Sequence, residues 1–536
     1  MKNRYAQDPG PTRRLDALFA RAQELGPTRR FDALFAFVLG ALLSTAFAPF
    51  SVFPLAVLCL VALFLMWESA TPRRAAWLGF AFGSGTFLAG TYWLYTSVHV
   101  FGQAPLWVAI FLMLALVAIM GAYHALVGYL VARWLPRPPL MRWLIAVPAL
   151  WVTVEWLRGW VLSGFPWLAL GYSQIDSWLA GYAPMVGVYG VSVLVVMSAG
   201  ALVATLREPG GARVLGVIVL AAIWGGGWWL ARLEWTQPAG EPLTVSLVQG
   251  AISQDLKWQK ENRDRTFELY RELNRQALGS RIIVWPEAAL PALAHEIDDF
   301  LKERYREARA RGSDLIVGAL RYDFERKQYR NSILAMSDDL TWYDKRRLVP
   351  FGEFFPVPDF VRGWMRLMSL PYVDMTAGQP EQPPLAAGGQ RLGATICYED
   401  AYGSQQLEVL KRATLLVNVS NDAWFGDSTA PHQHLEIARM RALEGGRSLL
   451  RATNDGITAV IGPDGRVLEK IRQFEPGVLT TEVEPRSGLT PYARTGNVPV
   501  VALCLFWLLI GLLAARAPPE SEKRGRVEPT LYRNRG

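Results

Sequence analysis

The sequence predicts a polytopic α-helical membrane protein that carries a separate α/β domain. The first observation is composition: of 536 residues, 51% are hydrophobic and only 19% are charged, which is unusual for a water-soluble globule. The second is the distribution of charge, because residues 31–233 contain only 14 charged residues. The third is an alternation of short apolar runs and polar helical stretches between residues 243 and 480, which is typical of a layered α/β fold.

Seven apolar segments before the α/β domain, and one after it, are long enough to span a membrane as helices. Residues 34–67 carry no charge, but Pro49 and Pro54 divide them into two spans. Residues 75–132 are also uncharged and are divided by a polar break at 99–103. The other four spans are expected at 143–162, 181–206, 214–233 and 498–515.

Arginines mark alternate connections between these spans and predict their orientation. They lie at positions 13, 14, 29, 30, 73, 74, 133, 137, 142, 207 and 213, whereas connections 48–54 and 97–105 have no Lys or Arg. Because short cytoplasmic loops are enriched in these residues, both termini are predicted to be cytoplasmic. The expected division is a cytoplasmic segment 1–30, seven spans in 31–233, an extracytoplasmic domain 234–494, an eighth span in 495–515 and a cytoplasmic tail 516–536.

The formal net charge of +8 is therefore interpreted as an insertion signal and not as a sign of nucleic-acid binding. Its basic excess falls in the terminal segments and the loops, while residues 234–515 are slightly acidic. The three cysteines, at positions 59, 397 and 504, are too few and too scattered for a disulfide framework.

Eight strands and four helices are expected in the α/β domain. The strands are Leu243–Gln249, Arg281–Trp285, Leu315–Leu320, Ser332–Met336, Leu392–Cys397, Leu415–Val419, Leu449–Thr453 and Thr458–Ile461. The helices are Trp258–Ala277, Leu293–Arg311, Ser404–Lys411 and His432–Glu444. In such folds the chemistry sits on loops at strand ends.

Three of these loops carry reactive side chains. Glu287 follows a strand and a proline, Lys345 stands in a charged run, and Cys397 ends an apolar strand. Each residue alone has a structural interpretation: a first helical turn, a solvated loop and a buried thiol, respectively. Together they supply a carboxylate, an ammonium and the one thiol outside the apolar segments, from three separate strand ends. A cysteine needs a neighbouring base or cation to react as a thiolate, and this set contains both.

The motifs around these residues resemble those of the nitrilase (carbon-nitrogen hydrolase) superfamily. They are WPE ending at Glu287, YDKxxLVPFGE over 343–353 and ICYE over 396–399. With the segments 92–102, 155–158, 164–167 and 187–192, the chain from about residue 31 to 515 resembles the apolipoprotein N-acyltransferase family of the bacterial inner membrane. The resemblance implies a four-layer α-β-β-α sandwich for the α/β domain and places that domain in the periplasm.

The resemblance also implies a ping-pong acyl transfer. Cys397 would take an acyl chain from a phospholipid, with the sn-1 chain of phosphatidylethanolamine as the expected donor, and hold it as a thioester. The α-amine of the N-terminal diacylglyceryl-cysteine of an apolipoprotein would then accept the chain. Glu287 would act as general base. Lys345 and the backbone N–H of Tyr398 would stabilise the oxyanion. No metal or organic cofactor is expected.

Further residues match positions that the family treats as required. Glu353 and Glu399 would orient Lys345 and hold the charge of the site, Tyr398 would support it, and Trp258 would line the acyl pocket. For Tyr398 and Trp258, plain packing is an equal alternative. Glu155 and Arg158 are interpreted as a mutual ion pair at a helix end, with a lipid headgroup contact as the alternative.

The stretch Phe354–Tyr372 is amphiphilic and predicts a lid that lies on the membrane surface. Its lipid-contacting residues would be Phe360, Arg362, Trp364 and Arg366. A second arm is expected from Ala423 to His432, with core packing as the alternative for both segments.

Three other functions remain open from the sequence. His432 and His434 could form a Cys/His site or bind a metal, but no accompanying ligand pattern supports this. A membrane-tethered amidase would use the same thioester chemistry with water as acceptor. A lipid carrier or transporter would fit the span count but leaves Glu287, Lys345 and Cys397 unexplained.

Overall fold

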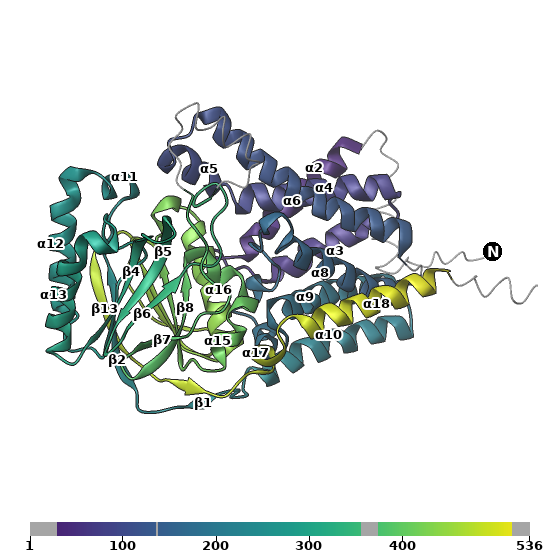
Figure 1. Ribbon diagram of the computed structural model, residues 1–536. Coiled ribbons are helices and arrows are strands. Elements are labelled where there is room, and N and C mark those ends of the chain that lie inside the picture. Colours follow the sequence, from purple (N-terminus) through teal and green to yellow (C-terminus); the bar gives the residue numbers. More distant parts are fainter. Residues whose placement is uncertain (1–28, 136–137, 355–373, 517–536) are drawn as a thin grey trace, which may run out of the picture.

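The computed structural model describes residues 29–135, 138–354 and 374–516. A bundle of apolar helices lies beside an α/β sandwich, and helix α16 (Ala430–Gly445) runs along the boundary between them (Figure 1). The lid residues Phe360, Arg362, Trp364 and Arg366 lie outside the described residues.

The helical part contains a helix at each of the eight expected span positions. They are α2 (Arg29–Leu43), α3 (Pro54–Glu68), α4 (Pro72–Gly90), α6 (Leu106–Trp134), α8 (Val147–Arg158), α9 (Ala183–Arg207), α10 (Gly211–Leu230) and α18 (Val498–Arg516). Within the described ranges, five helical segments are long and apolar enough to cross a membrane: 106–134, 139–158, 178–207, 211–230 and 498–515. The chain is therefore rich in helices suited to a membrane, and eight complete spans stay a prediction.

Glycines allow two of these helices to touch backbone to backbone. A Cβ added at Gly40 of α2 would lie 1.9 Å from the carbonyl oxygen of Phe82 in α4. A Cβ added at Gly85 of α4 would lie 2.0 Å from the carbonyl oxygen of Phe37 in α2. Such small-residue contacts are typical of helix pairs packed in a membrane.

The α/β part consists of two six-stranded sheets. One has the order β13-β2-β3-β4-β5-β6 and the other β12-β11-β10-β9-β8-β7. The first sheet contains β2 (Leu243–Gln249), β3 (Ile282–Val284), β4 (Asp314–Asp323), β5 (Gln328–Met336), β6 (Leu340–Asp344) and β13 (Gly477–Val483). The second contains β7 (Leu385–Ala387), β8 (Gln390–Ile396), β9 (Leu415–Ser420), β10 (Leu449–Thr453), β11 (Ala459–Ile461) and β12 (Val467–Lys470).

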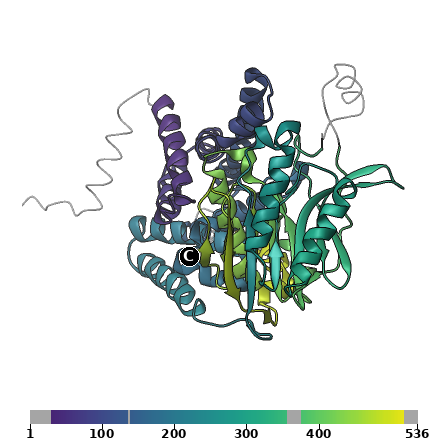
Figure 2. The same cartoon turned by 90° about the vertical axis from the view of Figure 1, so that its left-hand side faces the viewer.

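The two sheets pack face to face and helices cover both outer faces, which gives the expected α-β-β-α order. Side chains from both sheets, such as Val245, Ile282 and Val417, form one buried core between them. Helices α12 (Lys260–Gln276) and α13 (Asp298–Arg309) cover the first sheet (Figure 2). Helices α15 (Leu407–Leu410) and α16 cover the second.

All eight expected strands are present within a few residues, but the sequence did not predict β6, β7, β12 and β13, nor the short pair of β1 (Gln237–Pro238) with β14 (Arg486–Ser487). Strands β12 and β13 lie at sheet edges, and their mixed exposure hides an apolar pattern. The helix expected at Ser404–Lys411 is wrong in part, because 403–405 forms a 3₁₀ turn and only Leu407–Leu410 is α-helical. The helix expected at Leu293–Arg311 likewise starts as a 3₁₀ turn, with α13 beginning at Asp298.

Candidate active site

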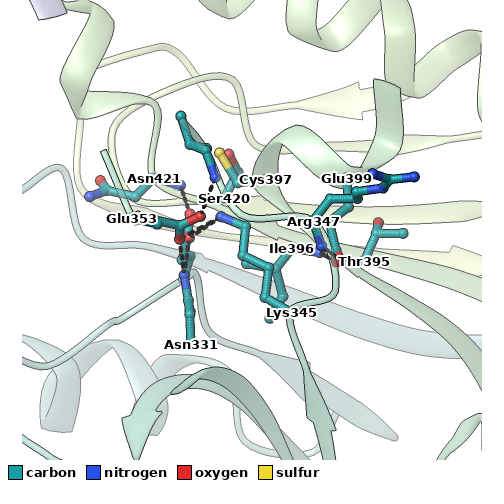
Figure 3. Close-up of polar contacts among 12 residues, drawn as sticks. Asn331, Lys345, Arg347, Glu353, Thr395, Ile396, Cys397, Glu399, Ser420 and Asn421 are labelled. Atoms are coloured by element: carbon teal, nitrogen blue, oxygen red, sulfur yellow. Dashed lines mark hydrogen bonds and ion pairs between the residues drawn. The ribbon is translucent and has the colours of Figure 1, made fainter. Parts of the chain in front are cut away.

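Three strand ends bring Glu287, Lys345 and Cys397 together between the two sheets. Glu287 follows β3 by three residues, Lys345 directly follows β6, and Cys397 directly follows β8. Lys345 Nζ lies 3.3 Å from Glu287 Oε1 and 2.8 Å from Glu353 Oε1. Figure 3 shows Lys345 pointing toward Glu353 and Asn331, with Cys397 beside them. The strand ends thus converge as the sequence predicts.

Both carboxylate oxygens of Glu287 are held by donors from other strands. Oε1 accepts hydrogen bonds from the Asn331 side chain at 2.6 Å and from Lys345, and Oε2 accepts one from the backbone N–H of Asn421 at 2.8 Å. The side chain is buried, with 6% of its residue surface exposed. A carboxylate fixed in this way has one orientation from which it can exchange a proton.

Lys345 is a buried ammonium held by two acids. Burial alone lowers its pKa, but the nearby carboxylates of Glu287 and Glu353 outweigh burial, so that the pKa of Lys345 is raised well above its usual range. Lys345 is therefore suited to donate hydrogen bonds and positive charge, and not to act as a base.

Glu353 holds the loop that follows Lys345 through its hydrogen bonds. Its Oε1 accepts hydrogen bonds from Lys345 and, at 2.9 Å, from Asn331, and its Oε2 accepts one from the backbone N–H of Val349 at 2.8 Å. The expected contact between Glu353 and Lys345 is present.

Asn331 is the residue that sequence reasoning missed. It lies on β5, its carbonyl accepts a hydrogen bond from the Lys345 N–H at 2.8 Å, and its amide bridges Glu287 and Glu353. The expected strand began one residue later, at Ser332, so the sequence did not place Asn331 in the sheet. Recognising that β5 pairs with β6 would have placed Asn331 near Lys345, because Ser332 pairs with Asp344, the residue before Lys345.

Cys397 stands in a left-handed backbone conformation, with φ of +51°, at the start of a 3₁₀ turn over Cys397–Ala401. This conformation is unfavourable for residues other than glycine and is found at functional turns. Burial raises the pKa of the thiol, and Glu287 raises it further while Lys345 opposes the shift. The resting group is therefore a thiol, and a base must remove its proton.

Glu399 reaches Lys345 only through the backbone. Its carboxylate accepts hydrogen bonds from the N–H groups of Arg346 at 2.6 Å and Arg347 at 3.1 Å, from Ile396 N–H at 2.8 Å and from the Tyr343 hydroxyl at 2.9 Å. Glu399 thus ties the Lys345 loop to the strand before Cys397. That Glu399 orients Lys345 stays a prediction, and its hydrogen bonds to the backbone of residues 346 and 347 would be the route.

The Tyr398 side chain points toward the helical part. Its hydroxyl donates to the carbonyl of Gly164 at 3.3 Å, and its ring stacks on Trp167 with a centroid distance of 6.2 Å. Trp258 lies elsewhere, about half exposed, at the end of a short helical turn Gln254–Lys257. The neighbouring Lys257 is buried, and its ammonium donates to the Glu287 carbonyl at 3.5 Å.

Two other expectations concern Glu155 with Arg158 and the second arm from Ala423 to His432. Glu155 accepts from the N–H of Leu170 at 3.1 Å, while Arg158 donates to the carbonyls of Phe165 at 3.0 Å and Trp167 at 2.7 Å. Both residues therefore hold the 164–170 loop, and their opposite charges also attract each other, although no salt bridge of 4 Å or less joins them in the described structure. The expected second arm packs in part, because the Phe425 ring contacts Trp93 at a centroid distance of 4.9 Å whereas Trp424 is 40% exposed.

Sγ of Cys397, a carboxylate oxygen of Asp422 and a ring nitrogen of His434 lie within 4.8 Å of one another, close enough to share a metal ion. Both ring nitrogens of His434, however, face carboxylates, with Nδ1 2.9 Å from Asp422 and Nε2 3.0 Å from Asp400. Burial and Arg451 disfavour the charged ring, but the two acids raise the pKa of His434 to about 9. Both ring nitrogens of His434 are therefore engaged by carboxylates in this structure. His432 is half-buried on the same helix.

Known proteins resemble this chain along both of its parts. A sequence model of the apolipoprotein N-acyltransferase N-terminal domain matches residues 39–201, and that of carbon-nitrogen hydrolases matches residues 244–492. The apolipoprotein N-acyltransferase of Chromobacterium violaceum is 44% identical over 485 residues, which are 89% of this chain and 93% of the relative. That of Methylococcus capsulatus is 40% identical over 491 residues, covering 91% and 97%. These alignments include the helical part as well as the strand ends that carry Glu287, Lys345 and Cys397, and the chain therefore belongs to the apolipoprotein N-acyltransferase family.

Proposed function

We propose that this enzyme moves an acyl chain from a phospholipid, through a thioester on Cys397, to the α-amine of the N-terminal diacylglyceryl-cysteine of an apolipoprotein. One observation carries the proposal. A buried thiol, a fixed carboxylate and a buried ammonium converge in a domain that packs directly against a bundle of apolar helices. A soluble amidase needs the thiol, the carboxylate and the ammonium, but not the bundle of apolar helices.

In the first half-reaction, Glu287 accepts the thiol proton of Cys397 and the sulfur attacks the ester carbonyl of the donor lipid. Lys345 and the Tyr398 N–H stabilise the oxyanion, each donor contributing on the order of 3 kcal/mol in comparable sites. The C–O bond to glycerol then breaks, and the departing oxygen takes the proton from Glu287. The products are an acyl-thioester and a lysophospholipid. The acyl chain is expected to come from the sn-1 position of phosphatidylethanolamine.

In the second half-reaction, the acceptor must lose a proton before its nitrogen can attack. Glu287 is again the base, because the thioester forms on the sulfur beside it. The amine attacks the thioester carbonyl, the C–S bond breaks, and the thiolate recovers the proton held by Glu287, while the second proton of the nitrogen passes to water as the amide forms. Asn331 and Asn421 support this exchange, because their hydrogen bonds keep the Glu287 carboxylate in one position.

We also propose how the molecule lies in the membrane. Eight spans, seven in 31–233 and one in 495–515, carry a periplasmic domain at 234–494, with segments 1–30 and 516–536 in the cytoplasm. Large apolar side chains on the outer faces of α6 and α18, among them Trp107, Phe111 and Phe506, support contact with lipid. The lid residues Phe360, Arg362, Trp364 and Arg366, and the half-exposed Trp258, are proposed to contact the lipid substrate.

The test is to trap the intermediate. Purified enzyme is mixed with phosphatidylethanolamine labelled in its sn-1 chain, and the peptide that contains Cys397 is measured by mass spectrometry. We expect a mass increase of one acyl group on Cys397, which disappears when a diacylglyceryl-cysteine peptide is added and reappears on the amine of that peptide. Cys397→Ala should show neither product.

Two outcomes would contradict the proposal. Label that appears only as free fatty acid in the presence of the peptide would favour the membrane-tethered amidase. Full acyl transfer by Cys397→Ala would show that no thioester on Cys397 is needed and would refute the proposed route.

A further inference from the structure

A cluster of four charged side chains packs against the Cys397 turn. Asp400 belongs to that turn, Asp422 to the turn after β9, His434 to α16 and Arg451 to β10. All four side chains are at most 1% exposed. None of them has a part in the acyl transfer described above.

Each acid of this cluster lies within salt-bridge distance of both His434 and Arg451. His434 bridges the two aspartates, as described above, and Arg451 does the same, with nitrogens 3.3 Å from Asp400 and 2.9 Å from Asp422. Two positive and two negative charges leave the cluster neutral. Burying four charges brings little net stability even when they are paired, so a position-specific role explains the cluster better than stability does.

The cluster touches the reactive residue through one atom. His434 Nε2 lies 3.2 Å from the carbonyl oxygen of Cys397, and Asn418 Nδ2 lies 3.4 Å from the same oxygen. Arg451 donates to Asn418 Oδ1 at 2.7 Å, which turns the amide nitrogen of Asn418 toward Cys397. Two donors positioned by the cluster therefore hold this carbonyl.

Holding the carbonyl also aims the next N–H. The C=O of Cys397 and the N–H of Tyr398 belong to the same planar trans peptide and point in opposite directions. Because the carbonyl of Cys397 points toward His434, the Tyr398 N–H points away from His434, to the side where the acyl group is proposed to bind. N–H groups at the start of a helical turn are not used by the turn itself, so this one is free to meet an oxyanion.

We infer that His434, held between Asp400 and Asp422, is a positioning residue that orients the Tyr398 N–H as an oxyanion donor. The inference rests on the proposed acyl transfer through Cys397. In the described structure the hydrogen bond of His434 to Cys397 goes to the carbonyl oxygen and not to the thiol, so we expect His434 to act on the step in which negative charge develops on the carbonyl oxygen of the donor lipid.

The test separates oxyanion stabilisation from thiol reactivity in His434→Gln. The first measurement is the single-turnover rate of acyl-Cys397 formation from phosphatidylethanolamine. The second is the rate at which iodoacetamide alkylates Cys397, followed at that peptide by mass spectrometry, because alkylation forms no oxyanion. We expect acylation to slow by at least tenfold with little change in KM, and alkylation to stay within twofold of wild type.

His432→Gln is the matched control, since His432 lies two residues away on the same helix and is only half-buried. It should match wild type in both measurements. A second variant, Asp400→Asn, removes one acid that keeps His434 charged and leaves Asp422 and Arg451 in place. Its acylation rate should fall at pH 8.5 and recover toward wild type at pH 6, where the imidazole protonates without Asp400.

Several outcomes would overturn the inference. They are acylation by His434→Gln within twofold of wild type, an equal fall in acylation and alkylation, and a pH-independent defect in Asp400→Asn. One zinc ion per chain retained by wild type and lost in His434→Gln would also overturn it, since a ligating imidazole cannot be the charged donor. Wild type that forms no acyl-Cys397 would instead refute the proposed function itself.

Discussion

The side-chain amide of Asn331 donates hydrogen bonds to two carboxylates, and this arrangement predicts the effect of a single substitution. Asn331→Ala removes hydrogen bonds of 2.6 Å to Glu287 and 2.9 Å to Glu353. A hydrogen bond to a charged group contributes about 1.5–3 kcal/mol, and losing the equivalent of one such bond in the transition state should lower kcat/KM by about 10- to 150-fold. Asn331→Asp places a third carboxylate beside Lys345, and the increased repulsion should move the acid limb of the activity profile to higher pH.

The measurement is kcat/KM between pH 5 and 9 for both variants. Gln276→Ala, on the exposed face of α12, is the control and should match wild type. An acid limb in Asn331→Asp that coincides with wild type would show that the amide does not couple the two acids.

His434 gives a pH-dependent stability of known sign. Its pKa is about 9 in the folded protein and near 6.5 in an unfolded chain, so the folded state binds its proton more tightly. The resulting stabilisation is complete below pH 6.5 and is lost as the pH rises through 9. At about 1.4 kcal/mol per pKa unit it is at most on the order of 3 kcal/mol.

The thermal unfolding midpoints of wild type and His434→Gln should therefore differ more at pH 6 than at pH 9.5. Taking the difference between the two proteins cancels the titration of other buried groups. A gap of the same size at both pH values would mean that His434 is not charged in the folded protein.

Which site residues the sequence could predict depends on what positions them. Glu287 and Cys397 end apolar runs, and Lys345 stands in a motif, so their places were visible. Asn331 and His434 act through contacts between distant segments: the first with Glu287, 44 residues away, and the second with the Cys397 turn, 37 residues away. That information lies in tertiary structure and not in any local pattern.

At the scale of elements, buried strands were predictable and edge strands were not. Strands such as β2 and β10 match their expected bounds because most of their residues are buried, which makes them richer in apolar residues than the segments around them. Strand β13 pairs with β2 along its whole length, yet its exposed threonines and glutamate resemble a loop in sequence. The strand ends that form the site belong to the buried class, apart from β6.

Helix α9 depends on one glycine. Gly187 has φ of +65° and ψ of −178°, a region that glycine alone populates readily, and it interrupts the helix. The break frees the N–H of Val188, which donates to Glu444 on α16 at 2.7 Å. A membrane helix is thereby capped by a residue of the α/β domain.

Gly187→Ala should destabilise the protein through both strain and collision. The backbone conformation costs about 1–3 kcal/mol for other residues, and the new Cβ would lie 2.3 Å from the Tyr492 ring. Gly211→Ala is the control, because nothing lies within 4 Å of its Cβ. We expect the unfolding midpoint in detergent to drop by several degrees for Gly187→Ala only. Equal midpoints for the two variants would contradict this role of the glycine.

At the scale of the whole molecule, the two ends of the helical bundle differ in what they contact. The connections without Lys or Arg face the α/β domain: the N–H of Ala48 donates to Glu436 at 3.1 Å, and Ser97 donates to the carbonyl of Trp424 at 2.8 Å. The arginine-bearing connections contact helices of the bundle: Arg74 pairs with Asp32, and Arg207 Nε lies 3.4 Å from Glu68.

This division into two ends supports the proposed orientation and leads to a topology prediction. Each variant carries one new cysteine in a background with Cys59, Cys397 and Cys504 replaced. Glu325→Cys lies in the exposed turn between β4 and β5, and Ser69→Cys lies beside Arg73 in the exposed turn between α3 and α4. Because arginines hold their connections on the cytoplasmic side, a membrane-impermeant maleimide should label only Glu325→Cys in intact spheroplasts.

Permeabilised spheroplasts are the control, since both cysteines should label there. Labelling of Ser69→Cys in intact spheroplasts, with Glu325→Cys protected, would invert the topology. The α/β domain would then lie in the cytoplasm, with Cys397 against the inner leaflet. The same pair of variants therefore decides from which leaflet the enzyme draws its acyl donor.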